Sequence, residues 1–135
     1  MDNELLVGRF DTNIDSKGRV KLPEEWGFAF GPGKLMYVVP AVDGRSLSLM
    51  PARYWDGALA GLREKALFDP KSAAALKKIG AESRMYTVSS DGTIELDGKM
   101  LEHGRLKDSV SFIGYYQNAK LYATENLPPD GEAFV

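Results

Sequence analysis

The sequence predicts a strand-rich α+β fold in which two similar halves share one hydrophobic core. Three observations lead to this prediction. Short apolar or alternating segments are separated by turns that contain glycine, and a stretch with helical periodicity occupies the middle of the chain. The two strand-rich parts also match when one is shifted along the other by 74 residues. With 135 residues, the chain is long enough for one domain with a stable core.

The first half, residues 1–50, begins with two strands joined by the sequence DSKG. Residues 5–14 alternate loosely and predict the first strand. In the second strand Val20 and Leu22 share one face, and the basic side chains beside them share the other, as in a half-buried strand. We expect Pro23 to end this strand, because proline cannot donate a hydrogen bond to a neighbouring strand.

The rest of the first half predicts a short helix and a hairpin. Residues 24–26 are compatible with one or two helical turns, and Gly31-Pro32-Gly33 predicts a turn. Residues 35–40, LMYVVP, form a continuous apolar run that is typical of a buried strand. A hairpin turn is predicted at Asp43-Gly44, and residues 46–50 alternate cleanly as the returning strand.

Residues 51–80 are predicted to form a linker of two helices. Pro51 suits the first position of a helix, where its missing N–H has no hydrogen bond to lose. One stripe of this helix, predicted to be a core or subunit-interface surface, consists of Trp55, Leu59, Leu62 and Ala66. Asp69-Pro70 predicts the start of a second helix through residues 73–79, which Gly80 is expected to end.

The second half, residues 81–124, returns to a strand pattern. Turns are predicted at residues 90–92 and at residues 117–118, and a mixed segment lies between them. The predicted strands are residues 85–88, 93–96, 110–116 and 120–123. Residues 125–135 are rich in proline and glycine and are expected to be a poorly ordered tail.

A shift of 74 residues places apolar positions of the first half on apolar positions of the second. It also places Gly18 on Gly92. The other coinciding pairs are Ile14 with Val88, Val20 with Ile94, Leu22 with Leu96, Trp26 with Met100, Met36 with Val110, Val39 with Ile113 and Leu47 with Leu121. We interpret this pattern as an internal duplication. Strands that pair across the two copies would close a small barrel and hide the edges of the sheet.

Composition excludes several classes of function. The chain has no cysteine, so it has no disulfide, no thiolate metal site and no cysteine nucleophile, which fits a reducing cytoplasm. A lone histidine, His103, is expected to be a surface or cap residue and argues against a metal centre or a catalytic triad. No set of side chains predicts an enzyme, a metal or another cofactor. No apolar run approaches the length of about 20 residues needed to cross a membrane.

Residues 14–23, IDSKGRVKLP, with GRF a few residues ahead of them, are similar to the signature of the MraZ family. The likeness extends from about residue 5 to about residue 124. It implies a duplicated AbrB-like swapped-hairpin β-barrel with pseudo-two-fold symmetry, each half carrying a D-x-x-x-R motif. It also implies a closed ring of many subunits. The implied function is a cytoplasmic, nucleoid-associated regulator of transcription that binds short repeated boxes in double-stranded DNA upstream of cell-wall and division genes.

The first motif, residues 15–19, is intact, but the second departs from the family pattern. Ser89 and Thr93 stand where aspartate and arginine are expected. Residues 15–21 carry three positive charges and one negative charge, a net charge of +2, whereas residues 89–95 carry two negative charges and no positive one, a net charge of −2. Only the first motif is therefore suited to a phosphate backbone.

Four basic residues are the predicted DNA contacts. Arg19 offers a planar set of donors that suits a phosphate or the edge of a guanine. Lys17 and Lys21 would each contact a phosphate, and Arg9 would add a further contact if its strand lies alongside.

Two further residues of the first motif are predicted to shape the turn. Asp15 would orient Arg19 or cap the turn, and Gly18 would allow a positive φ.

The basic residues of the first turn also have a simpler interpretation, because basic residues on a hairpin commonly form only a solvated edge. The overall charge of the chain is −2, with 17 basic and 19 acidic residues. The alternative function is therefore a ring-forming scaffold that keeps the fold but has lost DNA binding.

Overall fold

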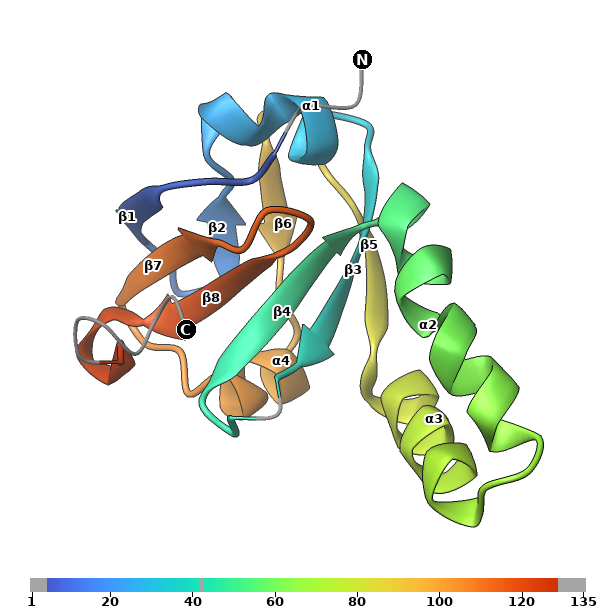
Figure 1. Cartoon of the computed structure of the whole chain (residues 1–135). Helices are drawn as coiled ribbons and strands as arrows, with labels where there is room; N and C mark the ends of the chain where they lie inside the picture. The colour runs from blue at the N-terminus through green and yellow to red at the C-terminus, as the bar shows by residue number, and fades with distance from the viewer. Residues whose placement is uncertain (1–4, 42, 129–135) are drawn as a thin grey trace.

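The computed structural model describes residues 5–41 and 43–128, without the side chains of Trp55, Asp56 and Ala58 (Figure 1). The chain folds as a strand-rich α+β protein, as predicted. The strands are β1 (Arg9–Asn13), β2 (Arg19–Lys21), β3 (Leu35–Pro40), β4 (Ser46–Pro51), β5 (Arg84–Thr87), β6 (Thr93–Glu95), β7 (Ser109–Gly114) and β8 (Ala119–Ala123). The helices are α1 (Gly27–Phe30), α2 (Ala52–Ala66), α3 (Pro70–Glu82) and α4 (Gly98–His103), with 3-10 turns η1 (Glu24–Trp26) and η2 (Thr124–Asn126).

Six strands form one antiparallel sheet in the order β1-β7-β8-β4-β3-β5, and β2 pairs with β6 in a separate two-stranded ribbon. Within the described residues no closed barrel is found, which corrects the sequence-based expectation. β1 and β5 are the two edges of the large sheet, each hydrogen-bonded to a single neighbouring strand. β2 and β6 pair with each other in the ribbon, and within residues 5–41 and 43–128 neither is hydrogen-bonded to an edge of the large sheet.

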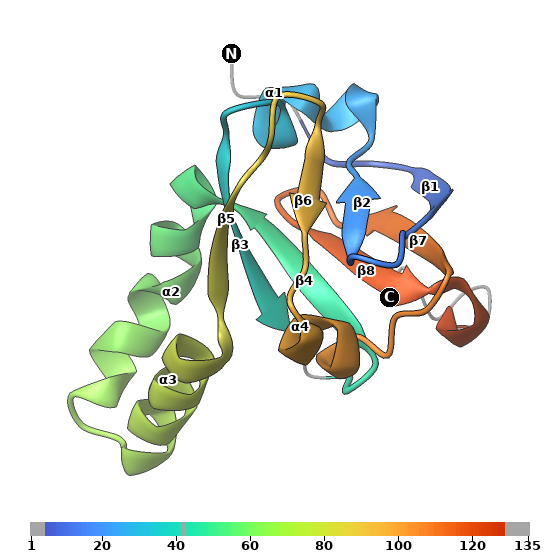
Figure 2. The same cartoon turned by 180° about the vertical axis from the view of Figure 1, so that it is seen from behind.

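Strands from the first part of the chain pair with strands from the last part. β1 pairs with β7, β5 with β3, and β4 with β8 at the centre of the sheet. Figure 2 shows β2 and β6 side by side in the ribbon. The bounds of β2 and β6 differ by 74 residues (19 + 74 = 93 and 21 + 74 = 95), as do those of β3 and β7 (35 + 74 = 109 and 40 + 74 = 114).

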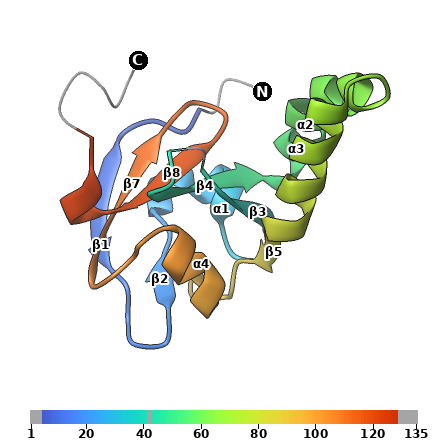
Figure 3. The ribbon, with the colours of Figure 1, turned by 90° about the horizontal axis from the view of Figure 1, so that it is seen from below.

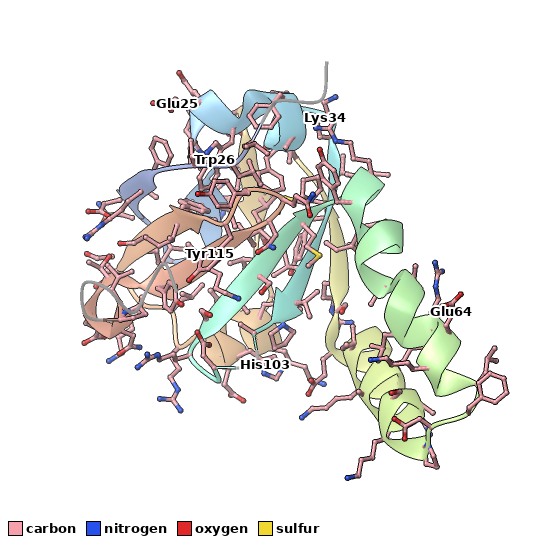
Figure 4. The ribbon with its side chains drawn as sticks, viewed as in Figure 1. Glu25, Trp26, Lys34, Glu64, His103 and Tyr115 are labelled. Atoms are coloured by element: carbon pink, nitrogen blue, oxygen red, sulfur yellow. The ribbon has the colours of Figure 1, made fainter. Side chains whose placement is uncertain are left out.

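The core is centred on Trp26, which is 1% exposed. Its ring packs edge-on against Phe10, Phe30 and Phe112, with ring centroids 5.1, 6.3 and 6.0 Å away. Its indole Nε1 donates a hydrogen bond of 3.1 Å to the carbonyl oxygen of Val7. Each such aromatic pair adds about 0.5–1.5 kcal/mol beyond the burial of apolar area, so these contacts hold α1 and η1 on the sheet (Figure 4).

The helices α2 and α3 form a hairpin that projects away from the sheet (Figures 1 and 3). The stripe residues Leu59, Leu62 and Ala66 are half-buried, while the side chain of Trp55 lies outside the described residues. Pro51 is the last residue of β4 and the N-cap of α2 rather than its first helical residue, because its backbone is extended (ψ 139°).

The predicted end of the second linker helix was wrong. α3 runs through Gly80 to Glu82, because a single glycine costs a helix only about 1 kcal/mol, and the helix ends where Ser83 N–H and Oγ both donate to the carbonyl of Ile79. The mixed segment contains α4, whose N-cap Asp97 accepts from the amide of Met100 at 2.9 Å. None of the described helices is both long and apolar enough to cross a membrane. Of the predicted tail, residues 129–135 lie outside the described residues.

Candidate nucleic-acid interface

Asp15 closes the turn between β1 and β2, which we call the first turn (residues 15–19). Its carboxylate Oδ1 accepts hydrogen bonds from the backbone amides of Lys17 and Arg19, both at 2.9 Å. The backbone of Asp15 accepts from Gly18 N–H and donates to the carbonyl of Arg19, both at 3.0 Å. One aspartate side chain thus satisfies two amides of the turn, as in an Asx-type turn.

The same carboxylate orients the side chain of Arg19. Arg19 Nε donates to Asp15 Oδ2 at 2.8 Å, and the arginine side chain is 50% exposed. Hydrogen bonds from the backbone and side chain of Arg19 lower the pKa of Asp15 below its usual value, and the same pair raises the pKa of Arg19. Among the described residues no hydrogen bond involves the terminal Nη atoms of Arg19.

Gly18 allows the first turn to approach β6. Its φ is +83°, and a Cβ atom at this position would lie 2.5 Å from the carbonyl oxygen of Leu96. The glycine carbonyl accepts from Leu96 N–H at 2.9 Å, which continues the pairing of β2 with β6 beyond the strands. A side chain is therefore excluded here by backbone conformation and by space.

The outer face of the β2–β6 ribbon carries charges of both signs. Val20 and Ile94 pair across the ribbon and are buried, so the residues beside them point outwards. Arg19 lies opposite Glu95, and the negative charge of Glu95 also raises the pKa of Arg19. Lys21 lies opposite Thr93, with its Nζ atom 3.6 Å from Glu24 Oε1. The acidic side chains on this face partly offset the basic ones.

The other two predicted basic contacts differ in position. Lys17 is exposed at the tip of the first turn and has no ion pair within the described part of the chain. Arg9 begins β1, whereas the first turn follows the far end of that strand, about 13 Å along a five-residue strand. Its guanidinium forms a two-point ion pair with Asp11, at 3.0 and 3.1 Å. The structure brings Lys17, Arg19 and Lys21 together and places Arg9 apart from them.

The second turn, residues 89–93, has the same backbone hydrogen bonds without the basic side chains. Ser89 N–H donates to the carbonyl of Thr93 at 2.9 Å, and Gly92 N–H donates to the carbonyl of Ser89 at 3.0 Å. Ser89 Oγ accepts from the amide of Thr93 at 3.2 Å, where Asp15 uses a carboxylate. Asp91 accepts from the hydroxyls of Ser89 and Thr93. This turn is therefore stable without an arginine and presents a carboxylate.

A partly buried polar cluster, not found from the sequence, lies in the β4–β8 region. Burial opposes ionisation of Asp43, but hydrogen bonds from Arg45 N–H, Ser46 Oγ and Tyr122 Oη lower its pKa overall. Burial and the charge of Asp43 raise the pKa of Tyr122 to about 12, and burial lowers the pKa of Lys120. The cluster ties the β3–β4 turn to β8. Nothing in the sequence links Asp43 to a tyrosine 79 residues away.

The described residues show neither a catalytic site around His103 nor a metal site. His103 is the last residue of α4 and is partly buried (Figure 4). In the described part of the chain, no three histidine or acidic side chains lie close enough together to hold a metal ion.

Comparison with known proteins identifies several relatives. The chain is 26% identical over 129 residues to "Transcriptional regulator MraZ" of Thermomicrobium roseum, covering 95% of this chain and 88% of that protein. It is 28% identical over 131 residues to the protein of that name in Chlorobium phaeobacteroides (90% and 85% covered), and 24% identical over 122 residues to the one in Pelagibacter ubique (87% and 77% covered). No protein-family profile matches the chain. These matches span most of both chains, so the similarity to proteins of this name extends over nearly the whole sequence.

Proposed function

We propose that this chain is a sequence-specific DNA-binding regulator of transcription that contacts double-stranded DNA through the first turn and β2. The observation that carries the proposal is the geometry of Arg19. Asp15 holds its Nε atom at 2.8 Å, while no hydrogen bond occupies its Nη atoms within the described residues. Relatives named transcriptional regulators support a role in transcription regulation rather than an enzymatic one.

In this proposal each basic residue has a separate role. The oriented guanidinium of Arg19 contacts a phosphate or the edge of a guanine in the major groove. Lys17 and Lys21 contact phosphates on either side, and Asp15 and Gly18 keep the turn in its shape. Arg9 adds a phosphate contact further along the duplex, after exchanging its pairing with Asp11.

The proposed assembly is a homo-oligomeric ring of subunits, each with two AbrB-like halves. The halves are residues 1–50 and 81–124, joined by the helical linker of residues 51–80 and followed by the tail of residues 125–135. The equal spacing of β2 from β6 and of β3 from β7 supports the duplication. A ring would present one first turn per subunit, so weak contacts would add up on repeated promoter boxes upstream of cell-wall and division genes. The protein would act in the cytoplasm, on the nucleoid.

One observation favours a second candidate function, a ring-forming scaffold without DNA binding. Glu95 lies directly opposite Arg19, and the carboxylate of Asp91 projects from the second turn. Both negative charges would lie near a phosphate backbone bound to the ribbon and would weaken that binding.

Fluorescence anisotropy with DNA from upstream of the protein's own gene, at low and moderate salt, tests the proposal. We expect tight binding that weakens steeply with salt. Arg19→Ala should lower the affinity by roughly 5- to 150-fold, since a good bidentate contact to a base is worth about 1–3 kcal/mol. The matched control is Arg53→Ala, which removes an exposed arginine from α2 and should leave binding unchanged. Absence of binding by a folded, oligomeric wild-type protein would favour the scaffold.

A further inference from the structure

A pocket of about 300 Å³ lies beside the second turn, between that turn and α1. Leu22, Pro23 and Phe30 contribute apolar surface to its lining. Gly27 leaves one side of the pocket open, because a Cβ atom built there would meet nothing within 4 Å. The pocket is therefore an open space next to the core that adjoins the outer face of the ribbon at Lys21.

At the first turn, Leu101 of the second half fills the equivalent space. The 74-residue shift that places β2 on β6 places Gly27 on Leu101 (27 + 74 = 101) and Gly18 on Gly92 (18 + 74 = 92). At the first turn, Leu101 Cδ1 lies 3.4 Å from the position of a Cβ on Gly18. At the second turn, the nearest atom to a Cβ on Gly92 is Lys21 Cε, at 3.9 Å. A leucine packs under one turn, and a glycine leaves the space under the other open.

The charge at the rim of the pocket also differs from the charge at the matching positions of the first turn. The shift places Asp91 on the position of Lys17 (17 + 74 = 91), and both Asp91 and Glu24 line the pocket. Among the described residues, the cation in the lining is Lys21, with its Nζ atom 3.6 Å from Glu24 Oε1. Hydrogen bonds from the hydroxyls of Ser89 and Thr93 lower the pKa of Asp91 and keep its carboxylate ionised. Two carboxylates against one ammonium leave the rim with a net negative charge of one.

We propose that this pocket binds a small organic cation with a flat apolar body. The body would lie against Pro23 and Pro32, and the cationic group would face Glu24 and Asp91. Such a site has the usual character of a small-ligand pocket, a mainly apolar lining with a few polar groups that set orientation. The site would lie between the two halves, where residues 21–32 of the first half meet the second turn.

Two indole probes with side chains of similar length and opposite charge test the site: tryptamine and indole-3-propionate. Each is titrated into the ¹⁵N-labelled full chain at pH 7, and amide shifts are followed by NMR. We expect tryptamine to move the signals of Gly27, Gly31 and Gly92 in a saturable way, and indole-3-propionate to bind at least about fivefold more weakly. Equal binding of both probes, or shifts elsewhere without shifts at these glycines, would overturn the proposal.

Gly27→Leu places a leucine in the pocket beside the second turn, as Leu101 is placed beside the first turn. Gly27 has helical backbone angles, φ −59° and ψ −25°, and open space at its Cβ, so the variant should fold. We expect tryptamine affinity to fall at least tenfold. The control is Gly61→Leu, which places a leucine in open space on α2 and should leave affinity unchanged.

Glu24→Gln tests the charge of the rim. It should weaken tryptamine binding on the order of two- to fivefold, as expected for an exposed ion pair, and should leave indole-3-propionate binding no weaker. Unchanged tryptamine affinity in both Gly27→Leu and Glu24→Gln would show that the cation binds outside this pocket.

Discussion

Gly18 and Gly92 occupy the two turns with nearly equal φ angles, +83° and +82°, but in different surroundings. A Cβ on Gly18 would lie 2.5 Å from Leu96 O, whereas a Cβ on Gly92 would have no atom nearer than 3.9 Å. Gly92→Ala should therefore cost only the strain of a positive φ, about 1–2 kcal/mol. Gly18→Ala should cost about 1–3 kcal/mol more, because the backbone must shift to remove the overlap.

Urea unfolding of the two alanine variants measures this difference in the free energy of unfolding. The second-turn glycine acts as the matched control for the first-turn glycine. Equal destabilisation would contradict the close approach of the first turn to β6.

The ion pair of Asp15 and Arg19 should make stability depend on pH. The pKa of Asp15 in the folded protein lies below its ordinary value of 3.8. A lowered pKa contributes stability above the unfolded-state value, and this contribution is lost as the pH falls through the folded-state value. Asp15→Asn should therefore be less stable than the wild type at pH 7 and approach it in stability at pH 2–3. Urea unfolding at the two pH values checks this, and a gap that does not change with pH would refute it.

Among the secondary-structure elements, α3 is held by its cap more than by burial. Asp69 accepts from Lys71 N–H at 3.1 Å and from Ser72 Oγ at 2.9 Å, and Ser72 is the only buried residue among the described side chains of α2 and α3. Asp69→Ala should remove about 1 kcal/mol of helix stability. We expect hydrogen exchange to accelerate across α3 while the β3, β4 and β8 amides keep their protection, because a weakly buried hairpin can open locally. Equal acceleration in the sheet would show that the hairpin and the sheet unfold together.

How well each element could be predicted depended on what stabilises it. The alternation of Val20 and Leu22 located β2, and the pattern of residues 46–50 located β4. In a half-buried strand every second side chain is buried, so the alternation of apolar and polar residues predicts the strand directly. The six residues of α4 have no such stripe. That helix is fixed by the Asp97 cap and by burial of Met100, so its position depends on tertiary contacts.

At the scale of the whole molecule, the tip of the α2–α3 hairpin carries the two most exposed large apolar side chains among the described residues. Phe68 is 89% exposed and Leu67 76% exposed, on the part that projects from the sheet (Figure 3). If the proposed ring uses this hairpin, Phe68→Ser should lower the oligomer mass measured by light scattering at micromolar concentration. Val7→Ser, which changes another exposed apolar side chain, should not. An unchanged mass for Phe68→Ser would exclude the tip from the interface.

The sequence by itself determined the strand-rich α+β class, the equivalence of the two turns and the loss of basic charge from the second one. These features depend on residue type and spacing, which a chain carries whether folded or not. Only the tertiary structure decided that β2 and β6 form a separate ribbon instead of closing a barrel, and that Glu95 lies opposite Arg19. It also decided that Leu101 packs against the first turn while Gly27 leaves a pocket beside the second turn. Those outcomes depend on which distant segments pair and how closely they approach, and local sequence patterns do not encode such distances.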